Sequence, residues 1–388
     1  MSKWPMVRLG DITTVVAGST PSTFIDDYWN GSNCWVTPAE LSDEVIIVED
    51  TERKITDLAV EKTGLKPMPV GTVLLSSRAP IGKVAIAGCV MYCNQGFKNL
   101  ICGEEVFNKY LFWFLKSRKE YLNSLGRGAT FKEISKTIVE DISIPLPSPK
   151  VQSQIANVLD KAQEIIDGHK KQLEELDKLI ESTFCNMFGD PVANEQGWKI
   201  QTLKDVCNRI TDGTHNSPAN YAIGEYRYIT AKNIKKDGFD FSNLTYISEA
   251  DHKEIYKRCN PELGDILYIK DGVTTGIAQI NTLQEEFSLL SSVALLKQNR
   301  EVVNEHYLRE VLNNRIMYAN IRTNMGGAAI TRLTVQKIEL IRIPLPPMAI
   351  QNKFAKLVAN IETQKSLVKQ SLADSQNLFN SLMSRYFD

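Results

Sequence analysis

The sequence contains one pattern twice, and this repetition constrains the fold more than any other feature. The segment Ile144-Pro-Leu-Pro-Ser-Pro-Lys-Val-Gln152 recurs 199 residues later as Ile343-Pro-Leu-Pro-Pro-Met-Ala-Ile-Gln351. Similar offsets of 193 and 194 residues relate two further pairs of segments: Val70-Gly-Thr-Val-Leu74 and Leu263-Gly-Asp-Ile-Leu267, then 4–9 and 198–203. Repetition at a fixed period indicates a duplicated structural unit. We therefore expect two copies, each with a Trp-led opening, a strand-rich body, a Gly-rich stretch, a Pro-rich strap and a long helix.

Each copy is predicted to end in a long amphipathic helix. Ser148 is a suitable N-cap and Pro149 a suitable first helical residue. Apolar residues follow at spacings of three and four, and Phe188-Gly189-Asp190-Pro191 is a typical helix end. A matching stripe covers 350–386. An antiparallel coiled coil would bury both stripes, although such a stripe is also typical of an ordinary core helix.

The bodies are predicted to mix strands and helices. Hydrophobic periodicity predicts strands at 70–75, 83–87, 266–269 and 277–280 and amphipathic helices at 107–121 and 305–318.

Composition indicates an ordinary globular protein. The 388 residues suggest two or three domains, and 43% are apolar and 23% charged. The longest apolar run, Val84 to Cys93, is too short to cross a bilayer, and the start has no secretory apolar region, so we expect a soluble cytoplasmic protein without membrane contact. The seven cysteines lack a CxxC pair, which predicts reduced, mostly buried thiols rather than disulfides or a zinc site.

Charge is segregated along the chain although the net charge is only -1. The stretch 41–65 carries a net charge of -4, whereas 66–139 carries +7. One interpretation is a surface whose charges balance, and the other is a basic face toward a polyanion.

Motifs for catalysis are largely missing from the sequence. Pro80-Ile81-Gly82-Lys83-Val84 lacks the first Gly and the final Ser or Thr of a phosphate loop. No Asp/Asn-Pro-Pro-aromatic motif is present to hold the target amine of a methyltransferase. Glu52-Arg53-Lys54 with Asp43 matches a nuclease pattern that arises often by chance, and the four histidines lack metal-ligand spacing.

The arrangement resembles the specificity subunits of type I restriction-modification systems. The segments that carry the resemblance span the chain: 18–21, 28–38, 210–215, 263–267, the two Ile-Pro-Leu-Pro straps with Gln152 and Gln351, and Met187-Phe-Gly-Asp-Pro191. The resemblance implies an α+β fold with two similar globular target-recognition domains separated by two long antiparallel coiled-coil helices. We expect a pseudo-two-fold, circular organisation in which the second helix ends where the first copy begins. The expected divisions are 1–145 and 191–344 for the recognition domains and 146–190 and 345–388 for the spacer helices.

The resemblance also implies a function. Such a subunit reads double-stranded DNA without catalysing a reaction. Its expected partners are methyltransferase subunits, two in number, and restriction subunits that translocate DNA. S-adenosylmethionine, ATP and magnesium are expected on those partners, and no cofactor or metal is expected in this chain. Because the two bodies differ in sequence, the predicted target is bipartite and non-palindromic.

Candidate DNA-binding residues are polar side chains near the strands and the Gly-rich stretches. Arg can contact guanine, and Asn or Gln can contact adenine, in the major groove. The candidates are Arg78, Lys83, Asn94, Gln95, Lys98, Arg127, Thr130 and Lys132 in the first body and Thr214, His215, Lys232, Asn233, Lys270, Thr274, Thr275, Arg322, Asn324 and Arg332 in the second. Many of the basic residues are expected to contact phosphate instead, and an alternative role for Gln95 and Asn233 is to satisfy buried backbone groups.

Other functions remain open at this point. One alternative is the specificity subunit of a related bifunctional, type II-like restriction-modification system. A second is a stand-alone nuclease or methyltransferase, and a third is a coiled-coil adaptor without affinity for DNA.

Overall fold

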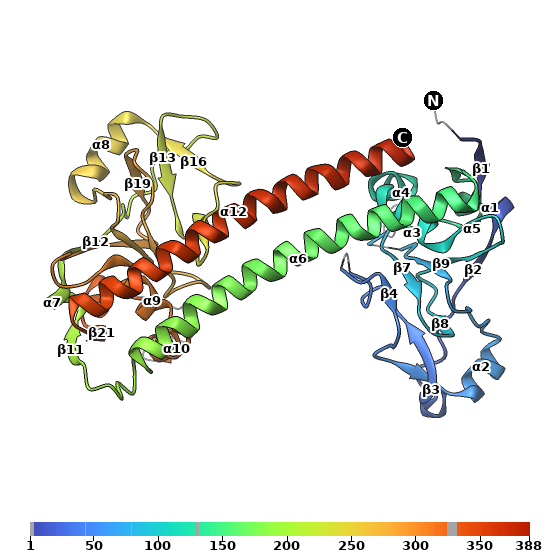
Figure 1. The fold of residues 1–388 in the computed structure, drawn as a ribbon, viewed down its shortest axis with the longest axis horizontal. Helices are drawn as coiled ribbons and strands as arrows, with labels where there is room; N and C mark the ends of the chain where they lie inside the picture. Colours follow the sequence, from blue (N-terminus) through green and yellow to red (C-terminus); the bar gives the residue numbers. More distant parts are fainter. Residues whose placement is uncertain (1–3, 43, 79, 129–131, 324–331) are drawn as a thin grey trace. The chain divides into compact units, whose positions relative to one another are not determined.

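A computed structural model describes residues 4–42, 44–78, 80–128, 132–323 and 332–388 (Figure 1). The chain divides into two compact units. Unit 1 comprises Met1–Lys170 and Gln370–Asp388, and unit 2 comprises Lys171–Lys369. Each unit is described by itself below.

Unit 1 contains a five-stranded sheet in the order β2-β9-β6-β7-β4, a three-stranded sheet β5-β3-β8 and the pair β1-β10. Neighbouring strands are antiparallel except for β4 with β7 and β3 with β8. The elements are β1 (Met6–Arg8), α1 (Leu9–Ile12), β2 (Thr13–Ala17), η1 (Asp26–Tyr28), β3 (Trp29–Val36), β4 (Ile47–Val48), β5 (Lys54–Ile55), α2 (Asp57–Thr63), β6 (Val73–Leu75), β7 (Val84–Ala87), β8 (Met91–Cys93), β9 (Lys98–Cys102), α3 (Asn108–Ser117), α4 (Lys119–Leu125), α5 (Lys136–Glu140), β10 (Ser143–Pro145) and the first part of α6 (Pro149–Phe188).

Unit 2 contains a four-stranded sheet β12-β20-β17-β18, a three-stranded sheet β16-β13-β19 and the pairs β11-β21 and β14-β15. Its elements are β11 (Lys199–Thr202), α7 (Leu203–Val206), β12 (Cys207–Asp212), β13 (Tyr226–Ile229), η2 (Ala231–Asn233), β14 (Ile234–Lys235), β15 (Gly238–Phe239), β16 (Thr245–Ile247), α8 (Glu249–Arg258), β17 (Ile266–Ile269), β18 (Ala278–Ile280), β19 (Phe287–Leu289), β20 (Val293–Gln298), α9 (Glu305–Asn313), α10 (Arg315–Thr323), α11 (Val335–Glu339), β21 (Arg342–Leu345) and the first part of α12 (Met348–Phe387).

The two units share one framework. The strand order β2-β9-β6-β7 in unit 1 corresponds to β12-β20-β17-β18 in unit 2, and β5-β3-β8 corresponds to β16-β13-β19. The parallel pair β3 and β8 matches the parallel pair β13 and β19. The duplicated α+β architecture predicted from the sequence is therefore confirmed.

The Pro-rich straps join a strand to the start of each long helix. Pro145 lies in β10 and Pro344 in β21, and each of these strands belongs to a two-stranded pair, where a missing N–H group is tolerated. The hydroxyl of Tyr110 donates to the Pro145 carbonyl at 2.6 Å, and Tyr307 does the same with Pro344. Each Pro-rich strap thus connects a strand to the start of a long helix.

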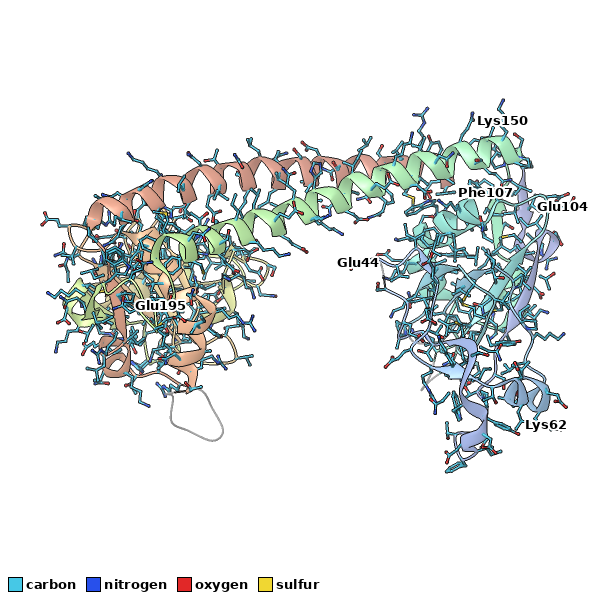
Figure 2. The ribbon with its side chains drawn as sticks, turned by 60° about the horizontal axis from the view of Figure 1, so that its bottom comes forward. Glu44, Lys62, Glu104, Phe107, Lys150 and Glu195 are labelled. Carbon is cyan, nitrogen blue, oxygen red and sulfur yellow. The ribbon has the colours of Figure 1, made fainter. Side chains whose placement is uncertain are left out.

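A buried glutamine fixes the start of each long helix. Gln152 donates to the carbonyls of Pro147 and Glu105 and accepts from the backbone N–H of Phe107. Phe107, which is labelled in Figure 2, therefore lies beside the first turn of α6. In unit 2, Gln351 donates to the carbonyls of Pro346 and Val302 and accepts from the N–H of Asn304. Both glutamines are fully buried, and they make equivalent hydrogen bonds in the two units.

The long helices α6 and α12 have 40 residues each, about 60 Å at 1.5 Å per residue, and each contributes to both units. In unit 2, Phe184 near the end of α6 packs against Phe354 near the start of α12. In unit 1, Ile155 and Leu159 near the start of α6 share a core cluster with Phe387 at the end of α12. Within each unit the two helix segments are therefore antiparallel.

The end of α12 completes unit 1 as the end of α6 completes unit 2. The Phe387 ring lies 5.4 Å from Tyr110, and the Phe188 ring lies 4.8 Å from Tyr307. Arg118 also binds the Asp388 carboxylate at 2.7 Å. The chain's last residues thus occupy in unit 1 the place that α6 occupies in unit 2, which is the circular organisation expected from the sequence.

Some local expectations differ from the structure. The single helices predicted at 107–121 and 305–318 are each two helices, because the backbone leaves the helical conformation at Arg118 and at Asn314. Only three of the seven thiols are buried, namely Cys34, Cys93 and Cys259, while Cys185 is exposed. The helices α6 and α12 fall partly in each unit, so the four-part division at 145, 190 and 344 stays a prediction about function.

Within the described ranges, no helix combines the length and the apolar character needed to cross a membrane.

Candidate nucleic-acid interface

Asp160 anchors α6 to the body of unit 1. Its carboxylate accepts hydrogen bonds from Trp113 Nε1 at 2.8 Å and from Lys109 Nζ at 2.6 Å. Both donors lie on α3, which packs on β7. Trp113 also meets Phe379 of α12 edge to face at 5.5 Å. A buried aromatic residue and a charge-assisted hydrogen bond therefore fix both helix segments to this body.

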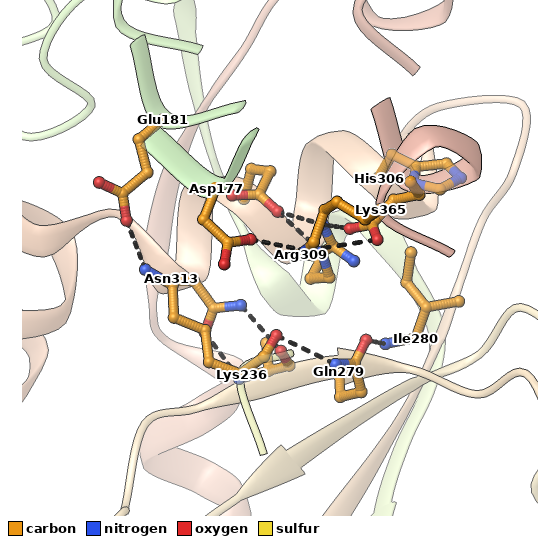
Figure 3. Close-up of polar contacts among 12 residues, drawn as sticks. Asp177, Glu181, Lys236, Gln279, Ile280, His306, Arg309, Asn313 and Lys365 are labelled. Atoms are coloured by element: carbon orange, nitrogen blue, oxygen red, sulfur yellow. Dashed lines mark hydrogen bonds and ion pairs between the residues drawn. The ribbon is translucent and has the colours of Figure 1, made fainter. Parts of the chain in front are cut away.

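Unit 2 uses a cluster of charges for the same purpose (Figure 3). Arg309 on α9 pairs with Glu310 at 2.6 Å and with Glu362 of α12 at 3.2 Å. The ammonium of Lys365, which is 3% exposed, lies 2.6 Å from the Asp177 carboxylate of α6. These groups lie between α6, α9 and α12. Each buried charge among them has a partner of opposite charge, which offsets the free-energy penalty of burial. The body of unit 2 is thereby held to its two helix segments.

An ion pair in unit 1 joins the end of β6 to the segment after the Gly-rich stretch. Ile134 N–H donates to the Ser77 carbonyl at 2.9 Å, and Arg78 and Glu133 form an isolated antiparallel bridge. Arg78 Nε donates to Glu133 Oε2 at 2.9 Å, and Lys98 Nζ lies 3.0 Å from Glu133 Oε1. Two cations thus share one carboxylate, which leaves a local excess of positive charge.

Unit 2 has an ion pair at the corresponding place. Leu333 N–H donates to the Lys270 carbonyl at 2.8 Å, and Asp271 and Arg332 form an isolated antiparallel bridge. Arg332 Nε lies 3.1 Å from Asp271 Oδ1. Beside this pair, the Asp212 carboxylate accepts Lys270 at 2.9 Å and Arg258 at 3.3 Å, so cations again outnumber acids.

The carboxylate in unit 1 is ionised at neutral pH. Burial alone would raise the pKa of Glu133, but hydrogen bonds from Lys98 and Arg78 outweigh burial and lower the pKa below its ordinary value of 4.5. The Arg78–Glu133 contact is therefore a true ion pair. Among the described residues, no group of three or more His, Cys, Asp or Glu side chains is placed to hold a metal ion.

The candidate residues of unit 1 are partly exposed and partly buried. Arg78, Gln95, Arg127 and Lys132 are exposed, and Gln95 accepts a hydrogen bond from Thr20. Lys83 and Asn94 are half-buried: Lys83 Nζ donates to the Pro38 carbonyl, and the Asn94 side chain accepts from Gly96 N–H. Lys98 is 8% exposed and already paired with Glu133, so we remove it from the proposed DNA contacts. Thr130 lies outside the described residues.

The candidate residues of unit 2 divide in the same way. Thr214 is half-buried, and His215, Lys232, Thr274 and Arg332 are exposed. Arg322 is half-buried and donates to the carbonyls of Val273 and Thr275, so it supports the loop after β17. Asn324 lies outside the described residues.

Three candidates of unit 2 are buried with their polar groups satisfied. Asn233 caps its own turn by accepting from Thr230 N–H, as the alternative role anticipated. Lys270 is 2% exposed and paired with Asp212, and the Thr275 hydroxyl donates to the Gly272 carbonyl. Since these side chains do not reach the surface, we no longer propose that they contact DNA.

The acidic partners of these basic residues are absent from the candidates predicted by the sequence. Glu133, Asp271 and Asp212 each hold a basic side chain in place. The sequence repeat contains a signal for two of these acids. When Ser77 is aligned with Lys270, Arg78 is aligned with Asp271. When Ile134 is aligned with Leu333, Glu133 is aligned with Arg332. The opposite charges at both aligned positions indicate an ion pair in each copy.

Comparison with known proteins identifies the family. A family model described as the type I restriction modification DNA specificity domain matches residues 1–178 and 195–374. The type I restriction enzyme MjaIX specificity subunit of Methanocaldococcus jannaschii is 33% identical over 377 residues, which cover 92% of this chain and 86% of that protein. The EcoDI specificity subunit of Escherichia coli is 23% identical, covering 72% of this chain and 69% of that protein.

Solved structures agree at the level of the fold. The crystal structure of a type I restriction-modification S subunit from M. genitalium superposes with a TM-score of 0.58 at 16% identity, covering 100% of this chain and 96% of that one. A chain from a structural study of type I complex assembly gives a TM-score of 0.62 at 17% identity, covering 99% and 97%. The two units thus define a duplicated DNA-specificity protein. The chain belongs to the type I restriction modification DNA specificity family, as the sequence resemblance indicated.

Proposed function

We propose that this chain reads a bipartite, non-palindromic DNA target, with each unit contacting one half-site. The observation that carries the proposal is that the units keep one framework but differ at their exposed polar residues. Gln152 and Gln351, like Tyr110 and Tyr307, make the same contacts in both units. Equal frameworks allow equivalent docking on DNA, and unequal surface residues read different bases.

The chain is proposed to act as the non-catalytic subunit of a complex. Its partners would be two methyltransferase subunits, together with restriction subunits that translocate DNA. S-adenosylmethionine, ATP and magnesium would bind those partners. This proposal rests on the missing amine-holding motif and phosphate loop and on the assemblies to which the related specificity subunits belong by name. Because its substrate is the DNA of the cell, we place the complex in the cytoplasm.

The test is to sequence the methylated sites of host DNA with and without this gene, in the presence of the methyltransferase partner. We expect a two-part motif with an unspecified gap that disappears when the gene is deleted. The purified chain alone should methylate and cleave nothing. A palindromic motif, or methylation by the isolated chain, would contradict the proposal.

A further inference from the structure

The two ion pairs at the bridges occupy the same place in the fold with their charges exchanged. In unit 1 the arginine, Arg78, follows β6 and the acid, Glu133, lies on the returning segment. In unit 2 the acid, Asp271, follows β17 and the arginine, Arg332, lies on the returning segment. The backbone hydrogen bonds beside them, from Ile134 to Ser77 and from Leu333 to Lys270, show that the positions are equivalent.

A buried lysine lies beside each pair. The Lys98 ammonium is 3.4 Å from the Ser77 hydroxyl in unit 1, and in unit 2 the position of Ser77 is occupied by Lys270 itself. The two lysines come from different strands and have different acidic partners, Glu133 and Asp212. Each unit therefore places a lysine beside the bridge, although the lysine comes from a different position in the two units. Positive charge at this place favours contact with a polyanion.

The guanidinium groups are placed to accept a second partner. The side chains of Arg78 and Arg332 are 45% and 54% exposed. Arg78 Nε donates to the Glu133 carboxylate, whereas Arg332 Nε lies 3.1 Å from Asp271 Oδ1, a buried atom without a hydrogen-bond partner in the described part of the chain. Among the described residues, neither guanidinium has a further ion pair. A guanidinium held at Nε retains the geometry for a bidentate contact with an acceptor such as guanine O6 and N7.

An arginine beside a carboxylate matches a G·C base pair in particular. In the major groove, guanine presents two acceptors and its cytosine partner presents the N4 donor. The arginine can therefore bind guanine while the carboxylate accepts from cytosine or holds the arginine in plane. The charges are exchanged between the units, so equivalent docking places the arginine over opposite strands of the base pair in the two half-sites.

We propose that each ion pair reads one G·C base pair, with guanine on opposite strands relative to the two units. Glu133 and Asp271 act as positioning residues for Arg78 and Arg332. This inference rests on the proposed function and adds to it the base pair, its position in the fold and its orientation.

The decisive variant exchanges the charges in unit 2, by Asp271→Arg together with Arg332→Asp. Unit 2 is the better choice because Arg332 is the one ion-pair partner of Asp271 among the described residues, whereas Glu133 also binds buried Lys98. Methylated sites are sequenced with the partner subunits present. We expect one position of one half-site to change its preference from G·C to C·G by about 10- to 100-fold, while the other half-site stays the same.

A matched control exchanges the charges of an exposed helical pair in the same unit, Glu249→Lys with Lys253→Glu. These exposed side chains are paired at 2.6 Å on α8 and take no part in the bridge, so this exchange should leave the motif unchanged. If the bridge variant keeps the original G·C preference, or if the control changes the motif in the same way, the proposal is wrong.

A second variant decides the case in which the charge exchange abolishes methylation. Arg332→Lys keeps the charge but loses the planar fork. We expect it to weaken the G·C preference about 10-fold or more at one position and to leave the rest of the motif intact, and Arg78→Lys should do the same in the other half-site. Full preference in both lysine variants would overturn the inference, whereas the absence of any two-part motif for the wild-type chain would instead overturn the proposed function.

Discussion

Each unit contains a fully buried glutamine that joins distant segments of the chain. Gln152 connects the start of α6 to the loop before α3, and Gln351 connects α12 to the loop before α9. Removing a buried amide side chain that has three backbone partners lowers the free energy of unfolding, because each partner loses its hydrogen bond without gaining one to water. The shared framework of the two units includes this set of contacts in both copies.

We expect Gln152→Ala to lower the free energy of unfolding by about 2–4 kcal/mol, because it leaves the Phe107 N–H group and two carbonyls unpaired. Gln172→Ala is the matched control, since Gln172 is exposed on the same helix. Urea unfolding of the two purified variants measures the difference. Equal stabilities would show that water replaces the lost hydrogen bonds.

His306 should make unit 2 sensitive to acid. Burial, followed by the charge of Arg309, lowers the pKa of His306 below its ordinary value of 6.5, and its Nδ1 atom is buried without a hydrogen-bond partner in the described part of the chain. As the pH falls below about 6.5, the unfolded chain binds a proton that the folded chain does not, so stability decreases.

The variant His306→Phe should therefore reduce the loss of stability between pH 7 and about pH 5. Thermal melting across this range is the measurement, and His169→Asn on α6 serves as the control. An unchanged pH profile for His306→Phe would assign the acid sensitivity to other groups.

At the scale of single residues, the sequence alone does not distinguish the exposed DNA-binding candidates from the buried ones. Lys98 and Lys270 are paired with acids 35 and 58 residues away, and such distances along the chain give no local signal. The side chains of Arg78 and Arg332 are about half exposed, and in each pair the acidic partner lies near Nε. The residue types were thus predictable, but their burial depends on the fold.

At the scale of elements, local chemistry made the helix ends the most predictable features. The helix α6 begins at Pro149 and ends at Phe188, as the capping pattern predicted, and Gly189 has a φ of 73°, which favours glycine. The sequence predicts one helix each at 107–121 and 305–318, where the structure has two. The break is hidden because the apolar pattern continues across Arg118 and Asn314 onto the same core. Periodicity therefore identifies the buried face of a helix better than a break within it.

Two glycines of the same region should respond in opposite ways to alanine. Gly168 is in the interior of α6, and an added Cβ atom would meet no atom within 4 Å. Gly168→Ala should therefore raise the free energy of unfolding by about 0.5–1 kcal/mol, and Gly189→Ala should lower it because of the positive φ. Chemical denaturation of both variants measures the changes, and destabilisation by Gly168→Ala would indicate that this helix needs a flexible position.

At the scale of the whole molecule, both long helices pass from one unit to the other. The described contacts of the unit 1 body with α6 reach Asp160, and those of the unit 2 body begin at Leu176. On α12, the described contacts of the unit 2 body reach Glu362, and those of the unit 1 body begin at Phe379. Between these limits, the described core clusters include no residue of either helix. Their length is therefore proposed to set the gap between the half-sites.

We expect that inserting four residues after Leu173 and four after Leu372 lengthens the recognised gap by about one or two base pairs. Each insertion adds about 6 Å and roughly one turn, which keeps the apolar stripes nearly in register. Two-residue insertions at the same sites rotate the stripes by about 200° and should abolish activity. Sequencing of methylated sites is the measurement, and an unchanged gap in the four-residue variant would show that the helices do not set the spacing.

The placement of Phe387 in the core of unit 1 has a consequence for synthesis on the ribosome. Unit 1 needs residues 370–388, yet its other part ends at Lys170, so about 200 residues must be translated in between. At about 5–20 residues per second this takes on the order of 10–40 s. During that interval the nascent first half exposes the apolar surface that the last helix turns will cover. Unit 2, whose residues are contiguous, can fold first even though it emerges second.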